Sequence, residues 1–413
     1  MRGVRVRIVA ALAVCTFVVA GTALAAGGKP DADFGQNGFA LSGSPSGEFG
    51  EDVSVLADGR IVAMGTVNQE NQFLLARFDP DGTLDATFGD QGRVIYEHEG
   101  AHTYAEAIET DAEGRIYVGG DFAPPGGRGQ LGVVRFTPDG LPDPEWGTNG
   151  VATAGALGRV FAEDDNLAVD GESALIAGDS NKGARVVRFG PDGELDQSFA
   201  SGGIATIGSL VSPGSVAVSG SGKVTVLGSG RNGQTGMAFS RLSSSGKLDK
   251  SIGQKGVLLA TFPDFLSIDA RSVALDGESA VGTGFAYLKG SGDDTDFALA
   301  RVTAKGKLDR GFGPDGKVTF DRGKDDTIFD AAIAGDGTIF GAGYTSGADF
   351  MGVAVTPKGK VDKSLGKKGF LLANPPKSEP AHGIALHDGK VFLAGTARLG
   401  DSGDDVAVAR FTP

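Results

Sequence analysis

Cysteine is almost absent from this sequence, since the chain of 413 residues contains only Cys15. A disulfide framework is therefore excluded, and packing and hydrogen bonds must hold the fold together. Histidine is also rare, with four residues. His98 and His102 lie four residues apart, but their segment is a loop without the glutamate of a zinc-protease helix. A zinc site needs three or four convergent ligands, so we expect no metal site and no cofactor.

Positive charge is in deficit. Lys and Arg together number 38 against 52 Asp and Glu, which gives a formal net charge of −14. No basic stripe is visible along the sequence, and the overall sign is wrong for a protein that binds nucleic acid. Composition therefore argues against a nucleic-acid partner.

Long apolar runs are missing except at the N-terminus. Arg2, Arg5 and Arg7 precede an apolar run, residues 8–20, that is too short to span a bilayer comfortably. Small residues at 23–25 then supply a cleavage site, so residues 1–25 are predicted to be a secretory signal peptide. We considered lipidation at Cys15, but Val14 fits a lipoprotein cleavage box poorly. We expect a secreted, cell-surface or periplasmic protein whose mature chain has no transmembrane segment.

A repeated segment organises the rest of the chain. Its clearest copy is LARFDPDGTLDATFGDQGRV, residues 75–94. The central apolar position of this segment recurs at Phe34, Phe88, Trp146, Phe199, Ile252, Phe312 and Leu365. Successive intervals are 54, 58, 53, 53, 60 and 53 residues, so seven units share a base period near 53.

Each period contains four short segments rich in β-branched and aromatic residues. In the first full unit these are residues 52–57, 60–65, 72–78 and 92–97. Asp58-Gly59 joins the first two, and this dipeptide between apolar runs is a strong hairpin signal. Four strands in each of seven units predict an all-β fold, a seven-bladed β-propeller that occupies residues 26–413 as one domain.

The two ends of the chain complement each other. Residues 38–42 form a fourth strand without a unit of its own, and Val406–Phe411 is a third strand whose fourth is missing. An unpaired edge would invite aggregation. We therefore predict that the N-terminal strand completes the last blade and closes the ring, with residue 40 beside residue 408 and Phe34 packed as Phe88 is.

The segments ARFDPDGTLDATFG, VRFGPDGELDQSFA and ARVTAKGKLDRGFG are similar to the bacterial delta-60 repeat family. The resemblance covers essentially the whole chain after residue 25 and implies an exported or surface protein with a propeller fold. It supplies no catalytic residues. Ile252 and Leu365 depart from the aromatic of the motif, and Ala200 replaces the glycine after Phe199.

An arginine stands eight residues before a recurring aspartate. The expected pairs are Arg77 with Asp85, Arg135 with Asp143, Arg188 with Asp196, Arg241 with Asp249, Arg301 with Asp309 and, across the closed ring, Arg410 with Asp31. The aspartates are either structural groups that cap a turn and pair with the arginine, or carboxylates that bind a ligand. Their recurrence at seven equal positions favours the structural interpretation. Unit six has Ala354 instead, so we expect Asp362 to rely on backbone amides alone.

Two kinds of acidic segment were weighed as calcium sites. Asp79–Asp85 superficially resembles a calcium loop, but its later copies lose the acidic positions and the bidentate glutamate is missing. Residues 291–294 and 402–405 form two further acidic loops. We interpret them as solvated loops of an acidic protein.

Loop lengths distinguish the two faces of the expected propeller. Turns between the first and second and between the third and fourth strands of each unit are regular, whereas the other connections vary. Innermost strands begin on the variable face, and polar residues recur there at Asp52, Glu106, Asp165, Asp269, Asp330 and His382. They form either a ring around the channel mouth that attracts cations or basic ligands, or scattered surface groups.

Variable loops on a rigid scaffold favour a binding or scaffold module. We expect a monomer that uses its variable face to bind an extracellular glycan, peptide or envelope polymer. The alternatives are a hydrolase or lyase that acts on an extracellular polymer, and a purely structural surface protein. Perturbed carboxylates or a histidine at the channel mouth would favour the enzyme, whereas an aromatic patch would favour binding.

Overall fold

The computed structural model describes most of the chain after residue 27. Its described ranges are 28–43, 47–67, 72–98, 102–123, 129–155, 165–180, 182–231, 234–290, 294–323, 325–346, 348–373, 375, 378–398 and 403–412. The predicted signal peptide and Cys15 lie outside them. In the described part of the chain no helix has the length and apolar character needed to cross a membrane.

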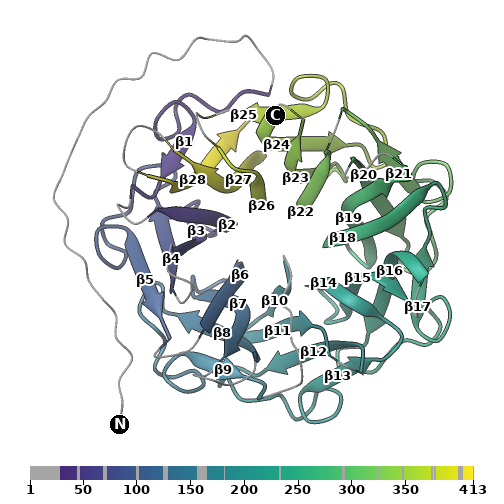
Figure 1. Cartoon of the computed structure of the whole chain (residues 1–413). Helices are drawn as coiled ribbons and strands as arrows, with labels where there is room; N and C mark the ends of the chain where they lie inside the picture. Colours follow the sequence, from purple (N-terminus) through teal and green to yellow (C-terminus); the bar gives the residue numbers. More distant parts are fainter. Residues whose placement is uncertain are drawn as a thin grey trace.

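Seven four-stranded antiparallel sheets form a closed ring (Figure 1). Blade 1 comprises β2 (Glu48–Val55), β3 (Ile61–Val67), β4 (Gln72–Phe78) and β5 (Arg93–Glu97). Blade 2 comprises β6 (His102–Thr110), β7 (Ile116–Ala123), β8 (Leu131–Phe136) and β9 (Val151–Thr153). Blade 3 comprises β10 (Leu167–Asp170), β11 (Ser173–Gly178), β12 (Ala184–Phe189) and β13 (Ile204–Ile207). Blade 4 comprises β14 (Val211–Val218), β15 (Val224–Arg231), β16 (Gln234–Leu242) and β17 (Val257–Ala260).

Blades 5 to 7 follow the same plan. Blade 5 comprises β18 (Phe265–Asp276), β19 (Ser279–Leu288), β20 (Thr295–Val302) and β21 (Lys317–Phe320). Blade 6 comprises β22 (Thr327–Ile333), β23 (Ile339–Thr345), β24 (Ala348–Val355) and β25 (Phe370–Ala373). Blade 7 comprises β26 (Ala381–His387), β27 (Lys390–Ala397), β28 (Asp405–Phe411) and the N-terminal β1 (Phe39–Leu41). The prediction of seven blades with four strands each is confirmed.

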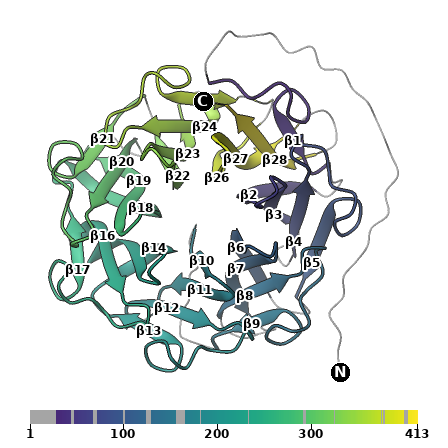
Figure 2. The same ribbon diagram turned by 180° about the vertical axis from the view of Figure 1, so that it is seen from behind.

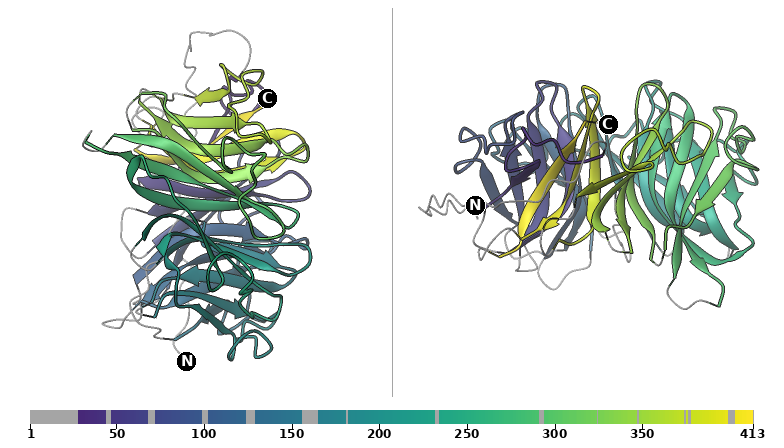
Figure 3. Two further views of the ribbon diagram at one scale, coloured as in Figure 1. Left: turned by 90° about the vertical axis from the view of Figure 1, so that its right-hand side faces the viewer. Right: turned by 90° about the horizontal axis from the view of Figure 1, so that it is seen from above.

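The first strand of each unit is the innermost. Strands β2, β6, β10, β14, β18, β22 and β26 surround the axis, and the view from behind shows the same arrangement (Figures 1 and 2). Seen from the side, the strands cross the thickness of a disc (Figure 3). Because each blade runs up and down, the connections β3–β4 and β5–β6 leave one face, the variable face, and β2–β3 and β4–β5 leave the opposite, regular face.

Closure occurs within blade 7. Strand β1 pairs antiparallel with β28, and Ala40 lies opposite Val408. This is the predicted register, and it leaves no blade with an unpaired third strand. The seam joins the two ends of the chain at the rim of the disc.

The segment between the third and fourth strands of each blade, called the corner below, packs against the neighbouring blade. Gly82 shows why the motif needs glycine, because its φ is +88° and a Cβ there would lie 2.6 Å from the backbone nitrogen of Gly35. Phe88 and Trp146 are fully buried at equivalent corners. Burying each such side chain contributes about 2–3 kcal/mol, so the repeated aromatic fastens each blade to the next.

Candidate functional site

An axial cavity of about 420 Å³ runs between the innermost strands of the seven blades. Most of the residues around it are hydrophobic, including Ile108, Leu167 and Ile384, but the surface that they expose to the cavity is mainly polar. Its acidic lining comes from Asp52, Glu109, Asp165 and Asp330. This cavity is the place where side chains from every blade approach one another.

A β-bulge interrupts six of the innermost strands at the same place. The residues at these bulges, where the register of the strand pairing shifts, are Glu51, Glu106, Gly214, Arg271, Phe329 and His382. A bulge bends the strand and turns the following side chain. The residue after each bulge is Asp52, Ala107, Ser215, Ser272, Asp330 or Gly383.

The residue after the bulge fastens one blade to the next. The Asp52 carboxylate accepts a hydrogen bond of 2.8 Å from the backbone N–H of Ile108 in blade 2. Asp330 accepts one of 2.9 Å from Ile384 in blade 7, and the Ser215 hydroxyl accepts one of 3.0 Å from Val273. The first role of these groups is therefore structural, because they satisfy amides at blade boundaries.

Asp165 and Asp330 are joined through serine hydroxyls. The Ser272 Oγ lies 2.8 Å from Asp165 Oδ2 and 2.9 Å from Asp330 Oδ1, and Ser215 Oγ lies 2.6 Å from Asp165 Oδ2. Two hydroxyl protons cannot fill three short contacts between oxygens. A third proton on one of the two carboxyl groups makes every contact a hydrogen bond, so the geometry fits a shared proton.

Burial and mutual repulsion both raise the pKa values of the carboxyl groups. Burial raises the pKa of Asp52 and of Asp165 well above the usual range, and the nearby Asp330 adds to both shifts. Burial, followed by repulsion from Asp330, raises the pKa of Glu109 to about 7. The cavity therefore holds protonated carboxyl groups near neutral pH.

The six residues predicted for the channel mouth divide into two sets. Asp52, Asp165 and Asp330 line the axial cavity, whereas Glu106 and His382 occupy bulges and Asp269 lies two residues before one. The acidic ring is incomplete, because Ala107, Ser215, Ser272 and Gly383 occupy the equivalent positions of four other blades.

Sequence reasoning identified His382 at the mouth but missed Glu51, Arg271 and Phe329, the bulged residues that lie beside it. Phe329 stacks on His382 with ring centroids 4.5 Å apart. The Arg271 guanidinium lies 5.8 Å from the Phe329 centroid, and His382 Nδ1 lies 3.5 Å from the carboxylate of Glu51. These four residues, called the mouth cluster, connect blades 5, 6, 7 and 1 in succession.

Further aromatic side chains surround the mouth cluster. Tyr344 lies 5.9 Å from Phe329, and Phe285 lies 5.5 Å from Arg271. On the blades that follow, Phe49 is 43% exposed and Tyr104 is 50% exposed. Each stands two residues before its bulge, so the variable face carries aromatic groups around the opening.

The motif arginines lie at blade boundaries rather than at the axis. Their N···O distances to the expected aspartates are 2.8 Å for Arg77–Asp85, 2.8 Å for Arg135–Asp143, 3.2 Å for Arg188–Asp196, 3.4 Å for Arg301–Asp309 and 2.7 Å for Arg410–Asp31. Arg241 donates to the carbonyl oxygens of Ala304 and Glu278 at 2.7 and 2.8 Å. The Ser251 hydroxyl, with a smaller contribution from Arg241, lowers the pKa of Asp249.

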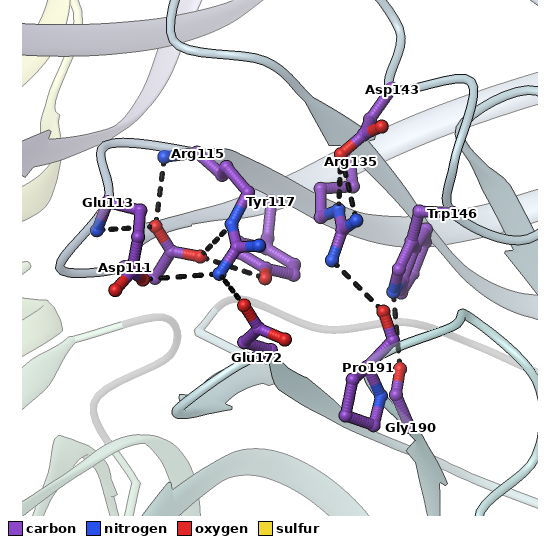
Figure 4. Close-up of polar contacts among 10 residues, drawn as sticks. All are labelled: Asp111, Glu113, Arg115, Tyr117, Arg135, Asp143, Trp146, Glu172, Gly190 and Pro191. Atoms are coloured by element: carbon purple, nitrogen blue, oxygen red, sulfur yellow. Dashed lines mark hydrogen bonds and ion pairs between the residues drawn. The ribbon is translucent and has the colours of Figure 1, made fainter.

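Each arginine also reaches the corner of the next blade. Arg135 pairs with Asp143 and donates to the carbonyl oxygen of Pro191, and the Trp146 indole donates to that of Gly190 (Figure 4). Corresponding acceptors serve Arg77, Arg188, Arg301 and Arg410. In the same view Arg115 joins Asp111 to Glu172 of blade 3. These contacts position blades and leave the carboxylates engaged.

Blade 6 departs from our expectation in one contact. Asp362 Oδ1 accepts hydrogen bonds from the Ser364 backbone at 3.0 Å and from the Ser364 hydroxyl at 2.5 Å. The expectation of backbone amides alone is therefore wrong, because the serine two residues later contributes its side chain. Ala354 is fully buried.

Among the residues that the structure describes, no group of three His, Cys, Asp or Glu side chains is arranged to hold a metal ion. Of the two acidic loops that we weighed, residues 291–293 and 402 lie outside the described residues. Asp404 pairs with Arg398 at 2.7 Å. His98 lies near Tyr96, with Nδ1 3.4 Å from the phenol oxygen.

Known proteins resemble this chain in architecture. A family model described as a domain of unknown function (DUF5122) β-propeller matches residues 56–88, 112–145 and 168–199. These three segments end at, or one residue before, the central aromatic of successive repeats, Phe88, Trp146 and Phe199. The match is to β-propeller repeats in these three segments and agrees with the fold described above. No curated protein matches the chain.

Solved structures give the same result for the fold. The polysaccharide lyase Uly1 aligns with a TM-score of 0.52 at 10% identity, covering 91% of this chain and 98% of that one. YCF48 from Cyanidioschyzon merolae aligns at 0.47 and 13% identity, covering 91% and 99%. A protein of unknown function from Dyadobacter fermentans aligns at 0.45 and 12% identity, covering 90% and 97%. At such identities the likeness shows the fold alone.

Proposed function

We propose that this chain is an exported, monomeric binding module of the delta-60 type, and that its ligand binds over the mouth cluster on the variable face. The observation that carries the proposal is the unbroken series Arg271–Phe329–His382–Glu51 across four blades. The predicted signal peptide supports export. Aromatic groups on the variable face also favour binding.

The chemistry of the mouth cluster suits a ligand with both apolar and polar faces. Aromatic rings offer flat apolar surface, while the guanidinium donates and the Glu51 carboxylate accepts hydrogen bonds. A sugar ring presents such faces, and so does a peptide with an aromatic or basic side chain. Extracellular glycans and envelope polymers are therefore the first ligands to test, followed by peptides.

A screen of the chain without residues 1–25 against arrays of glycans, envelope polymers and peptides tests the proposal. We expect retention of at least one ligand class, with affinity lost when Phe329 is replaced by alanine. An array without reproducible retention, on a correctly folded protein, would overturn the proposal and favour a purely structural surface role.

The rival function, hydrolysis or elimination on an extracellular polymer, is favoured by the raised pKa values of the axial carboxyl groups and by the histidine of the mouth cluster, His382. Glu109 has its pKa raised to about 7, and a carboxyl group that titrates there can serve as a general acid or base. Asp52, Asp165 and Asp330, by contrast, are engaged by backbone amides and serines of neighbouring blades. Polymer cleavage that is lost in Glu109→Gln with binding retained would establish the enzyme.

A further inference from the structure

The corners of blades 4, 5 and 6 differ in charge from those of blades 1, 2 and 3. Three positions of the corner decide this: the residues before and after its first glycine and the residue after the motif aspartate. In blades 4 to 6 they are Ser245, Lys247 and Lys250, then Lys305, Lys307 and Arg310, then Lys358, Lys360 and Lys363. In blades 1 to 3 they are Asp81, Thr83 and Ala86, then Asp139, Leu141 and Pro144, then Asp192, Glu194 and Gln197.

In blades 4 to 6, eight of these nine positions are basic. In blades 1 to 3, none of the nine is basic. The two halves share one backbone plan, so the fold does not require this difference. The sequence alone concealed it, because a corner recurs only about every 53 residues and no basic stripe appears along the chain. We call the three basic corners the basic strip.

Corners of adjacent blades are in contact, which makes the basic strip continuous. Arg241 of blade 4 donates to the carbonyl oxygen of Ala304 in the blade 5 corner at 2.7 Å. The backbone N–H of Gly313 in blade 5 donates to the carbonyl oxygen of Lys358 in blade 6 at 2.9 Å. Lys307, Lys360 and the other strip lysines are exposed, so their charges face solvent on the regular side of the disc.

A groove of about 750 Å³ opens in the basic strip between blades 5 and 6. Phe262, Phe265 and Phe320 line it together with Lys360 and Lys363. The rings of Phe262 and Phe265 are partly exposed. The Lys317 ammonium group, also in the lining, lies 5.6 Å from the Phe262 centroid. The groove thus combines aromatic surface with cations.

The equivalent groove between blades 2 and 3 provides an internal comparison. It has a similar size, about 910 Å³, and Asp192, Glu194 and Gln197 stand where blade 6 has Lys358, Lys360 and Lys363. Thr153, in the fourth strand of blade 2, lines this groove, whereas the fourth strand of blade 5 supplies Phe320 to the basic groove. The same architecture therefore carries opposite charge and less aromatic surface on the acidic half.

We propose that the basic strip binds an acidic polysaccharide, a linear glycan that carries a carboxylate on successive sugar rings. Cations repeated from corner to corner match a ligand whose charges also repeat, better than they match a single small anion. The aromatic groove contacts the apolar face of a pyranose ring, which an acidic peptide or a polyphosphate does not offer. The strip lies on the regular face, and the groove extends from it to the connection β17–β18, which leaves the variable face; none of the groove residues belongs to the mouth cluster.

The proposal is tested with polygalacturonate oligomers as the probe, by calorimetry at two salt concentrations. The variant Lys307→Thr/Lys360→Thr/Lys363→Ala introduces the residues that blade 1 has at these positions, so it should fold normally. We expect an affinity loss of about tenfold for this variant, and weaker binding of the parent at high salt. Phe262→Ser should weaken binding separately, without changing the melting temperature beyond a few degrees.

A matched control moves the charge without changing its total. It adds Thr83→Lys, Ala86→Lys and Gln197→Lys to the triple variant, which restores the parent's net charge on the other half of the ring. We expect binding to remain weak. Binding restored by this control would contradict a located site. Poly-L-glutamate bound as tightly as polygalacturonate, with no effect of Phe262→Ser, would overturn the polysaccharide assignment, and so would failure of the parent to bind polygalacturonate.

Discussion

The carboxylate of Asp31 lies 2.7 Å from Nη2 of Arg410, although 379 residues separate the two in the chain. The Arg410 guanidinium also stands over the Phe34 ring, 4.5 Å from its centroid. In blade 1, Arg77 stands over Phe88 at the same distance. The seam therefore repeats the contacts of a continuous blade, with its parts drawn from both ends of the sequence.

Removal of residues 26–44 should open this seam. β28 would lose its β1 partner, and the buried Ala40 would no longer cover its neighbours. We expect a lower melting temperature and concentration-dependent association, measured by calorimetry and by sedimentation. A deletion variant that stays monomeric and melts like the parent would show that the N-terminal strand is dispensable for closure.

Removal of a motif arginine should lower the free energy of unfolding substantially, whereas its addition in blade 6 should change that free energy little. Arg77 is 2% exposed and pairs with Asp85 at 2.8 Å, so Arg77→Ala leaves the buried carboxylate with only the longer contact to Arg60 at 3.4 Å. We expect a loss of about 3 kcal/mol in the free energy of unfolding. Ala354→Arg in blade 6 should change it by only about 0–1 kcal/mol. Urea unfolding of both variants measures this, and a loss of several kcal/mol for Ala354→Arg would mean that the blade 6 corner has no room for the side chain.

The axial carboxyl groups should make the protein more stable in mild acid than at pH 8. Glu109 has a pKa of about 7 in the folded state against 4.5 when unperturbed, so its folded form keeps a proton that the unfolded chain releases. Its stabilising contribution is full below pH 4.5 and is lost as the pH rises through 7. Asp85 acts oppositely: its pKa is lowered to about 2, so its contribution is lost only as the pH falls toward 2.

Glu109→Gln should flatten the fall in stability between pH 5 and pH 8. We expect the variant to exceed the parent at pH 8 by about 1 kcal/mol, with urea midpoints at several pH values as the measurement. Glu194→Gln, at an exposed corner far from the axis, is the control and should leave the profile unchanged. An unchanged profile in Glu109→Gln would show that this group titrates normally.

The fold was predictable because its signals are local and repeated. Each hairpin turn, such as Asp58-Gly59, and each motif aromatic, such as Phe88, occurs several times. A copy that matches the motif poorly can therefore be identified by its spacing from copies that match it well. The seam was predictable for the same reason, since a missing strand at one end matched an extra strand at the other. A repeat thus reports long-range pairing that a single sequence normally hides.

The site was less predictable because its contacts join different repeats. Asp52, Asp165 and Asp330 were identified from their place at the start of a strand, but Glu109 was not, because its pKa depends on burial and on Asp330. Phe329 and Arg271 were missed because a bulge has no sequence signature of its own. Aligning the residue before Asp52, Ser272 and Asp330 across units would have placed the bulged residues in one column.

The central claim is that ligand binds over the mouth cluster, and one comparison tests it most directly. A retained ligand other than an acidic polysaccharide is titrated against the parent, Phe329→Ala and Phe262→Ser, the last being an aromatic change outside the mouth cluster. The account predicts that Phe329→Ala lowers the affinity about tenfold or more, by loss of a buried stacking surface, while Phe262→Ser leaves it unchanged. Equal affinity of parent and Phe329→Ala, with both folded, would contradict the claim.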